Sequence, residues 1–453
     1  MLPMLRRSLP LLLVLLLGGR IICAADTHLV PTPRASLMPA SPTNRPFLAA
    51  DHALAPVDLA ASGYVESELA VSGFANVYEW AARGASEAVA VRGANVPYTT
   101  RILVRRPKDA ARFSGRVIVE LLDPAGLHDS APLWGLSWDH FLKRGDAWVG
   151  VTVKPVAAAT LRRFDAVRYA SLSFAYRRSG ACAVAPSAAD LPDAENGLAW
   201  DVIAQVGALL KSSSKENPLL QLNPQRVLAA GYSEAGGYIT TYANALHDGL
   251  RLGDGRPVFD GYLNAAGANA APINQCAAPL VDDDIRRLAP KIGVPFVTVM
   301  NGSDVLRAKP GPVPAGQPDA ADLTIAGYAA STADVCREPR ADFPPGYAFN
   351  AIWQQYEDLL VKQVPMTIEP RIEADTAGQV LRDGFANARA QGACPQPGSQ
   401  KLDASHLKAR YRTRAEFLSR FSLAVDEAAR ERRLTPEDAL ALKATAARAT
   451  PAF

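Results

Sequence analysis

Short apolar segments that alternate with helical segments constrain the fold of this chain more than any other feature. Beyond residue 115, helical segments, turns or long connections separate the apolar runs, which are 116–122, 147–153, 226–230, 261–266, 294–300 and 322–328. Strands that alternate with helices form parallel sheets that are covered on both faces. The sequence therefore predicts an α/β fold with a mostly parallel central sheet and helices on both faces.

The ends of the chain add further predictions. The segments YVESELAVSG (64–73) and RILVRRP (101–107) alternate like strands and predict an antiparallel start to the sheet. At the other end, 414–449 predicts two amphipathic helices, and Thr435 followed by Pro436 is typical of the start of the second. Helical spacing predicts further helices at 134–145, 197–211, 234–246 and 349–363.

The composition is that of a folded protein without a strong charge. Of 453 residues, 49% are hydrophobic and 21% are charged, which is enough for a large core and argues against global disorder. The formal net charge is only +3, and no basic stripe with interleaved aromatic residues occurs, so no nucleic-acid partner is indicated. There is no Cys-x-x-Cys pair and no cluster of histidine and cysteine, so a structural zinc site is not expected.

The first 25 residues have the pattern of a secretory signal peptide. Arg6 and Arg7 precede the apolar stretch Leu9–Leu17, which is too short to span a membrane comfortably, and small residues follow it. We expect cleavage near Ala25, export to the periplasm or the medium, and no stable membrane span in the mature chain. The adjacent arginines also permit a twin-arginine export route.

The mature chain is expected to form one domain with additions. Residues 26–60 are rich in proline and alanine without periodicity and predict an irregular leader. Residues 61–453 then form a single domain, with an excursion at 154–195 and a helical extension at 405–453. Both additions are expected to cover a pocket, although their apolar residues suit a lid or a core equally well.

Four cysteines remain after the expected cleavage: Cys182, Cys276, Cys336 and Cys394. An even number of cysteines in an exported chain predicts disulfides. Four cysteines allow three connectivities, and the sequence alone does not choose among them. We therefore expect at least partial pairing of these four thiols.

The stretch AAGYSEAGGY, which contains Gly231 and Ser233, carries the first chemical signal. It joins a strand-like run to a helical pattern and predicts that Ser233 is exposed on a sharp turn, as a nucleophile is. The elbow pattern G-x-S-x-G is met except at its last position, where Ala235 precedes Gly236 and Gly237. A small residue suffices there because the start of the helix must pack closely on a strand. An ordinary strand-to-helix turn is the alternative.

This order of elements, with a serine turn after the fifth major strand, resembles the α/β-hydrolase superfamily. Within it, the chain is similar to a bacterial family of exported α/β-hydrolase-domain proteins, on the segments GYVESELAVSGFANVY, PYTTRILVRRPKDAARFSGRVIVELLDPAG, WVGVTVKPV, FDAVRYASLS, RVLAAGYSEAGGYITTYANALH, PRIEAD and LTPEDALAL. These segments span nearly the whole mature chain. The resemblance implies an α/β-hydrolase fold with an inserted cap region, Ser233 as the nucleophile, and no metal or organic cofactor.

The resemblance also assigns partners to the serine. In this fold the chain order is serine, then an acid, then a histidine. The segment VTVMNGSDVL places Asp304 after a later strand, where the orienting acid is expected; an Asp in an Asx-turn is the alternative. The oxyanion hole needs backbone N–H donors, one from Glu234 and one from the loop after 116–122, where Leu122 and Asp123 are the candidates.

The histidine is the gap in this pattern. The family has a small-residue turn that ends in His-x-Asp after the last strand, whereas this chain reads YAASTADV and has Thr332 at the histidine position. A threonine hydroxyl does not act as a base near pH 7. His406 obeys the chain order and lies in an expected loop, so it is the candidate for a relocated base; a capping or surface role is the alternative. The remaining histidines are expected to be solvated or structural, or to lie at the mouth of the site: His28, His52, His128, His140 and His247.

Two functions follow from these residues. The first is an exported serine hydrolase that acts on carboxylic esters of small molecules, with Ser233 as nucleophile, Asp304 as acid and His406 as base. The second is a hydrolase-fold binding protein that has lost turnover, because losing a triad base costs about a millionfold in rate. A purely structural protein would leave the serine turn and Asp304 unexplained.

Overall fold

The structure of this chain is a computed structural model. It describes residues 28–43, 45–53, 56–81, 88–177, 182, 187, 190–267, 270–281, 284–287, 292–301, 322–328, 345–363, 366, 380–381, 404–450 and 452–453. The expected signal peptide lies outside the described residues, as do Asp304, Thr332, Cys336 and Cys394.

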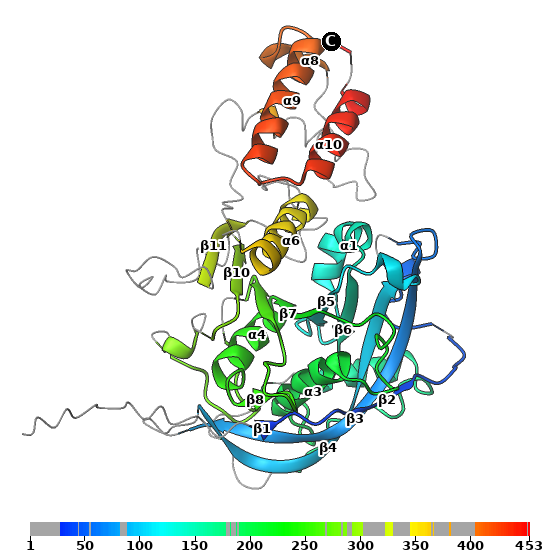
Figure 1. The fold of residues 1–453 in the computed structure, drawn as a ribbon, viewed down its shortest axis with the longest axis vertical. Coiled ribbons are helices and arrows are strands. Elements are labelled where there is room, and N and C mark those ends of the chain that lie inside the picture. Colours follow the sequence, from blue (N-terminus) through cyan, green and yellow to red (C-terminus); the bar gives the residue numbers. More distant parts are fainter. Residues whose placement is uncertain are drawn as a thin grey trace, which may run out of the picture.

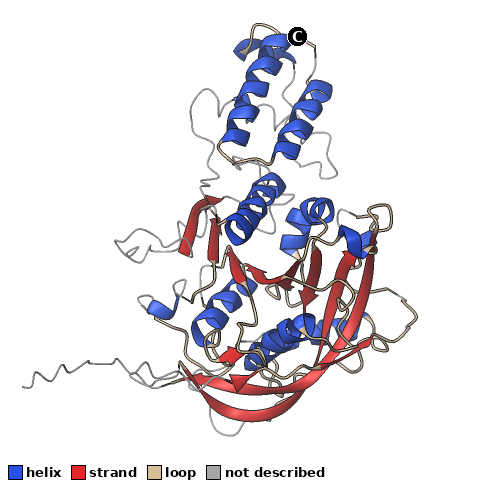
Figure 2. Cartoon of the chain, in the orientation of Figure 1, coloured by secondary structure: helices blue, strands red, loops and turns tan. Residues whose placement is uncertain are grey.

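The described strands form a nine-stranded sheet in the order β11-β10-β9-β7-β5-β6-β4-β3-β2 (Figure 2). Their bounds are β2 Arg34–Leu37, β3 Tyr64–Trp80, β4 Val89–Pro107, β5 Arg116–Leu121, β6 Ala147–Val151, β7 Arg226–Tyr232, β9 Gly261–Ala265, β10 Phe296–Asn301 and β11 Asp322–Tyr328. Every pair from β6 to β11 is parallel, and β4, β3 and β2 are added antiparallel. The predicted parallel sheet with an antiparallel start is confirmed.

Helices cover both faces of the sheet, as predicted (Figure 1). Their bounds are α1 Pro132–Arg144, α2 Pro155–Phe164, α3 Ala199–Lys211, α4 Glu234–Ala245, α6 Pro345–Lys362, α8 Ala404–Arg410, α9 Arg414–Arg430 and α10 Pro436–Ala449. Along β5, Val117 and Val119 join the buried cluster that holds α3 and α4, whereas Ile118 joins the cluster that holds α1 and α6. This alternation follows from the two-residue period of a strand.

The antiparallel part is longer than the sequence patterns indicate. β3 and β4 pair from Tyr64 opposite Pro107 to Trp80 opposite Val89, with a register shift near Val77. The predicted strands cover only one end of this ribbon, because its outer half is partly exposed and has no clean alternation. The ribbon curves around α3 in Figure 1, and α3 contacts β3.

The C-terminal helices attach to the domain through α6. The side chain of Asn350 donates to Asp438 at the start of α10 (3.1 Å), and that of Gln355 donates to the carbonyl oxygen of Arg432 between α9 and α10 (2.9 Å). The predicted cap of α10 is confirmed, since Thr435 accepts from the N–H of Asp438.

Two local predictions are wrong. The leader is not irregular throughout, because β2 pairs with β3 and a short strand β1 (His28–Leu29) pairs with β8 (Leu250–Arg251). These strands are stabilised by distant partners, which a local pattern does not contain. His406 lies in α8 and not in a loop.

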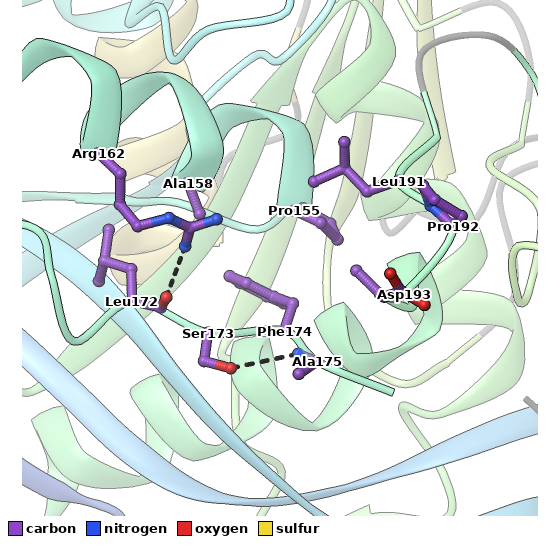
Figure 3. Close-up of a pocket in the computed structure, with 11 residues that line it drawn as sticks. Pro155, Ala158, Arg162, Leu172, Ser173, Phe174, Ala175, Leu191, Pro192 and Asp193 are labelled. Carbon is purple, nitrogen blue, oxygen red and sulfur yellow. Dashed lines mark hydrogen bonds between the residues drawn. The ribbon is translucent and has the colours of Figure 1, made fainter. Parts of the chain in front are cut away.

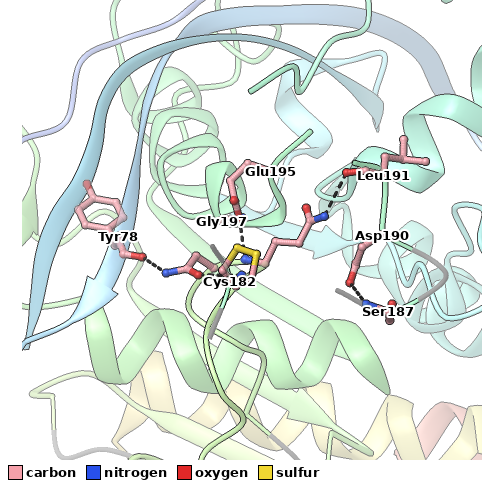
Figure 4. Close-up of a disulfide and its surroundings, with 10 residues drawn as sticks. Tyr78, Cys182, Ser187, Asp190, Leu191, Glu195 and Gly197 are labelled. Atoms are coloured by element: carbon pink, nitrogen blue, oxygen red, sulfur yellow. Dashed lines mark hydrogen bonds between the residues drawn. A yellow bond between two sulfur atoms is a disulfide. The ribbon is translucent and has the colours of Figure 1, made fainter. Parts of the chain in front are cut away.

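The four cysteines after residue 25 are at least partly paired, as predicted. Cys182 of the excursion forms a disulfide with Cys276, which follows β9, across 94 residues of sequence (Figure 4). Neighbouring hydrogen bonds join the same two segments: the N–H of Gln275 donates to Glu195 (2.7 Å), and its side chain donates to the carbonyl oxygen of Leu191 (3.0 Å). The excursion is therefore fastened to the segment after β9 at several points.

Candidate active site

Ser233 stands on a sharp turn between β7 and α4, as the sequence predicts. Its φ is 55° and its ψ is −120°. A residue with a side chain rarely adopts this region, which costs about 1–3 kcal/mol. The N–H of Ser233 donates to the carbonyl oxygen of Ala265 (2.8 Å), so the turn is tied to the end of β9. The Ser233 side chain makes no capping bond to α4, and the turn lies at the carboxyl edge of the sheet.

Glycines give this turn the room that it needs. A Cβ atom on Gly231 would lie 2.3 Å from the carbonyl oxygen of Ala235, and a Cβ atom on Gly236 would lie 2.3 Å from Oδ1 of Asn264 in β9. The close approach of helix to strand therefore falls at Gly236, one position after the last glycine of the elbow pattern. For this reason Ala235 is tolerated where the pattern has glycine.

The predicted main-chain donors on the β5 side are not free. The N–H of Leu122 donates to the carbonyl oxygen of Val151 (3.0 Å), and the N–H of Asp123 donates to that of Ser130 (2.8 Å). The assignment of the Asp123 N–H to the oxyanion hole is therefore wrong, because the loop after β5 closes on itself through this bond. The predicted donor on the other side, the N–H of Glu234, begins α4 directly after Ser233.

The carboxyl group of Asp123, and not its main chain, faces the start of α4. Oδ1 accepts a hydrogen bond from the N–H of Ala235 (3.4 Å), and the nearby N–H groups of Ala125 and Glu234 also lower the pKa of this carboxyl. Burial raises the pKa of the Asp123 carboxyl to about 6, the negative charge of Glu234 adds to the rise, and the N–H donors oppose it. The sequence signal for this role is an aspartate directly after a strand whose carboxyl end lies beside that of β7.

An ion pair lies on the other side of the serine turn. Nζ of Lys154, which follows β6 and precedes α2, is 2.7 Å from Oε1 of Glu234. Both side chains are partly buried, with exposed fractions of 12% and 34%. The pair links the excursion to the residue next to Ser233. Sequence reasoning missed it, because the two residues are 80 positions apart.

None of the histidine rings that the structure describes contacts Ser233. His52 pairs with Asp51, and the ring of His128 bonds the carbonyl oxygen of Gly126 and packs against Phe47. The other described rings are exposed or buried elsewhere: His28 is exposed, His140 is buried in α1, and His247 is bonded to the hydroxyl of Tyr262. Burial lowers the pKa of His247 to about 4, so this ring is neutral at the C-terminus of α4, where a cation was expected.

His406 belongs to α8, and Figure 1 places this helix at the end of the helical extension that is farther from the sheet, beyond α6. The structure thus does not bring the helix of His406 to the carboxyl end of β7. Asp304 and Thr332 follow β10 and β11 in the sequence, and both lie outside the described residues.

A cavity of about 400 Å³ opens beside α2 (Figure 3). Its walls are α2, the segment 172–175 and the segment 191–194, so the excursion lines a pocket as expected. The lining is mostly apolar, and the guanidinium of Arg162 donates across it to the carbonyl oxygen of Leu172 (2.5 Å). Pro155 lines this cavity and directly follows Lys154, which pairs with Glu234 of the serine turn.

Within the described ranges, no group of three or more His, Cys, Asp or Glu side chains is arranged to hold a metal ion. In the same part of the chain, none of the helices combines the length and the apolar character needed to cross a bilayer.

Comparison with solved structures gives only distant likenesses. A glucuronoyl esterase from Solibacter usitatus is 10% identical, with a TM-score of 0.26 and 53% of each chain covered. An alpha-beta serine hydrolase homologue from Coxiella burnetii is 10% identical, with a TM-score of 0.28 and 59% of this chain and 92% of that chain covered. An inhibited esterase B from Lactobacillus rhamnosis is 10% identical, with a TM-score of 0.31 and coverage of 65% and 88%. The chain thus spans about half the length of the glucuronoyl esterase.

Among curated proteins, none matches the sequence. The family model described as "Alpha/beta hydrolase domain" matches residues 30–328, about two thirds of the 453 residues. The match runs from the leader to the end of β11 and includes the serine turn. The chain therefore belongs to the α/β-hydrolase domain family.

Proposed function

We propose that this chain hydrolyses carboxylic esters of small molecules through an acyl-enzyme on Ser233. The observation that carries the proposal is the conformation of Ser233, which holds φ at 55° between the end of β7 and the first turn of α4. Backbone strain of this kind persists mostly where a function depends on it. In α/β-hydrolases the same turn presents the nucleophile above the sheet.

The reaction has two balanced halves. The hydroxyl oxygen of Ser233 attacks the ester carbonyl carbon, its proton passes to a base, and the carbonyl oxygen becomes an oxyanion. N–H groups at the start of α4 are the donors for that charge. The bond to the alcohol oxygen then breaks, and the alcohol leaves with the proton. Water attacks the acyl-enzyme in the second half, the carboxylic acid is released, and Ser233 regains its proton.

The acid and the base are proposed from their positions in the sequence. Asp304 comes three residues after β10 and is the proposed orienting acid. His406 is the proposed base by chain order, but its place in α8 gives this role no support. Thr332 stands four residues after β11, at the position of the family histidine.

A second function, binding of small molecules without turnover, is favoured by one observation. Each described histidine ring is engaged elsewhere or exposed, so none of them completes a triad with Ser233. A hydrolase fold that lacks its base keeps its pocket and its serine turn but loses most of its rate.

The two functions are separated by ester hydrolysis with purified variants. If the chain is a working hydrolase, wild type cleaves p-nitrophenyl acetate and butyrate, and Ser233→Ala lowers kcat/KM by about 10⁴-fold or more. His406→Ala then abolishes activity only if His406 is the base. If the chain is a binding protein, wild type is nearly inert, and Thr332→His raises the rate by about a hundredfold because a general base is restored.

Ser214→Ala is the matched control for Ser233→Ala, because Ser214 lies in the loop after α3 and caps only the N–H of Glu216. It should leave the hydrolysis rate unchanged. Robust wild-type activity that survives Ser233→Ala would contradict both functions, because the first routes its chemistry through that serine and the second has no turnover.

Export to the periplasm or the medium is also part of the proposal. The basic and apolar start of the sequence supports it, and so does the disulfide between Cys182 and Cys276, because disulfides persist in oxidising compartments. The test is N-terminal sequencing of the expressed protein from a cell fraction. A mature chain that begins near Asp26 in the periplasm or medium is expected; an intact chain that stays in the cytosol would contradict export.

A further inference from the structure

Asp123 has a fixed main chain and a side chain that faces the serine turn. It directly follows β5, and its N–H and carbonyl oxygen exchange hydrogen bonds with the main chain of Ser130 (2.8 and 3.0 Å). The hydroxyl of Ser130 also donates to the Asp123 carbonyl oxygen (3.2 Å). The residue is only 3% exposed. Any change at this position is therefore a rotation or a protonation of the carboxyl group alone.

The Asp123 carboxyl lies beside the N–H groups of the first turn of α4. Its Oδ1 accepts from the N–H of Ala235 (3.4 Å), and the N–H of Glu234 is close enough to lower the pKa of the same carboxyl. Glu234 directly follows Ser233, and in an elbow of this kind its N–H is the first donor of the oxyanion hole. An acidic oxygen of the protein itself thus lies beside the donors for the charge that a substrate oxygen would develop.

The charges around Asp123 leave it without a cation of its own in the described part of the chain. Glu234 on α4 faces it with a like charge, and Lys154 at the end of β6 is bound to Glu234. In the loop of Asp123 itself, Asp129 accepts from Thr152 and faces Arg101 of β4. His128, in the same loop, is exposed and bonded to the carbonyl oxygen of Gly126.

We propose that the Asp123 carboxylate is an internal lock on the Ser233 site: it occupies the N–H donors at the start of α4, and an ester carbonyl binds there only when the carboxyl is protonated or has turned away. The proposal rests on the proposed function of Ser233. Asp123 is a positioning residue in it, because it controls the donors and does not react. A proton from solvent opens the lock, since a neutral carboxyl is a much weaker acceptor for N–H groups than a carboxylate.

The lock predicts a pH dependence with a definite sign. The pKa of Asp123 is raised to about 6, first by burial and then by the charge of Glu234. The site is open below this pH and closes above it. At pH 8 only about 1% of the carboxyl is neutral, so a variant without the charge should react up to about a hundredfold faster than wild type.

The experiment follows phosphonylation of Ser233 by a neutral fluorophosphonate between pH 5 and pH 8, read by mass spectrometry. Asp123→Asn keeps the shape of the side chain and removes its charge. The ratio of its labelling rate to that of wild type should be about one at pH 5 and about two near pH 6, and it should approach a hundred at pH 8. Taking the ratio at each pH cancels the titration of whatever base serves Ser233.

His128→Gln is the matched control, because His128 lies in the same loop and its ring bonds the carbonyl oxygen of Gly126. Its labelling rate should follow wild type at every pH. A ratio for Asp123→Asn that stays near one from pH 5 to pH 8 overturns the lock. Slower labelling of Asp123→Ala at all pH values also overturns it, since the carboxyl would then help the reaction.

A second measurement does not need the serine chemistry. The amide signal of Glu234, assigned by its loss in Glu234→Gln, is followed by NMR in wild type, His128→Gln and Asp123→Asn. It should shift with a midpoint near pH 6 in the first two and stay constant in the third. If the fluorophosphonate does not react with Ser233 in any variant but this shift occurs, the proposed function fails and the carboxyl still holds the donors. If the signal does not respond to pH in wild type, the lock is wrong even when Ser233 is labelled.

Discussion

At the scale of single residues, the serine turn depends on two glycines, which have no Cβ atom. Ser233 keeps a positive φ because α4 lies close to β7 at Gly231 and close to β9 at Gly236, and both contacts require glycine. At Gly231 the neighbour is the carbonyl oxygen of Ala235, which belongs to the backbone of the first helical turn and has little freedom to move. The strain at Ser233 is thus maintained by its immediate neighbours in the chain.

This argument predicts that Gly231→Ala destabilises the fold and the site together. The added Cβ would lie 2.3 Å from the carbonyl oxygen of Ala235, so the turn has to open. Overpacking of this kind costs about 1–3 kcal/mol in the free energy of unfolding, and fluorophosphonate labelling of Ser233 should fall as well. Urea unfolding and labelling of the purified variant measure the two effects.

Gly135→Ala is the control, because Gly135 is exposed near the start of α1 and a Cβ there meets nothing within 4 Å. It should raise the free energy of unfolding by about 0.5–1 kcal/mol, as expected for glycine to alanine in a helix. Equal effects of the two substitutions would contradict a special requirement at Gly231.

At the scale of elements, α1 is held by a side chain from the sheet. Its N-cap residue Ala131 makes no capping bond; instead the Glu120 carboxylate of β5 accepts from the N–H groups of Leu133 and Trp134 (2.8 Å each) and from Nε1 of Trp148 (2.7 Å). The sequence predicts this helix and its stop at Gly145 from periodicity and a C-terminal glycine. It does not predict that Glu120 caps this helix. In the sequence Glu120 is one residue of a strand, and its side chain reaches α1 only once the sheet is formed.

The same helix carries a buried histidine that makes stability depend on acid. The pKa of His140 is lowered to about 3, first by burial and then by the charges of Arg116 and Arg144. A lowered pKa means that stability present above the usual value of 6.5 is lost as the pH falls towards 3. Between pH 6.5 and pH 4.5 the loss from this group is about 2 kcal/mol.

His140→Leu should remove this acid sensitivity, and it leaves few bonds unmade because Nε2 of His140 has no hydrogen-bond partner in the structure. The free energy of unfolding, measured in urea at several pH values, should fall less steeply with acid in the variant than in wild type. His52→Gln is the comparison, since that ring is half-exposed beside Asp51. A variant curve parallel to that of wild type would contradict the assignment.

At the scale of the whole molecule, the order of strands and helices follows from local periodicity, whereas the antiparallel end of the sheet does not. The parallel strands are continuous apolar runs because they are buried on both faces. β2 and the outer half of the long ribbon are partly exposed, so their patterns are weak and their pairing is fixed by distant neighbours. For the same reason the serine turn can be predicted from ten consecutive residues. The approach of Asp123 and Lys154 to this turn cannot, because it brings together residues that follow three separate strands.

The disulfide between Cys182 and Cys276 yields the last prediction, because it fastens the excursion that lines the cavity to the segment after β9 (Figure 4). Closing a loop of this length restricts the unfolded chain and stabilises the fold by about 2–4 kcal/mol. Cys182→Ser/Cys276→Ser should therefore unfold at a lower temperature than oxidised wild type. Dithiothreitol should lower the melting temperature of wild type towards that of the double variant and have a smaller effect on the variant itself. Peptide mapping without reduction checks the pairing directly: a peptide that joins Cys182 to Cys336 or Cys394 would contradict it, because the excursion would then be fastened to a different part of the chain.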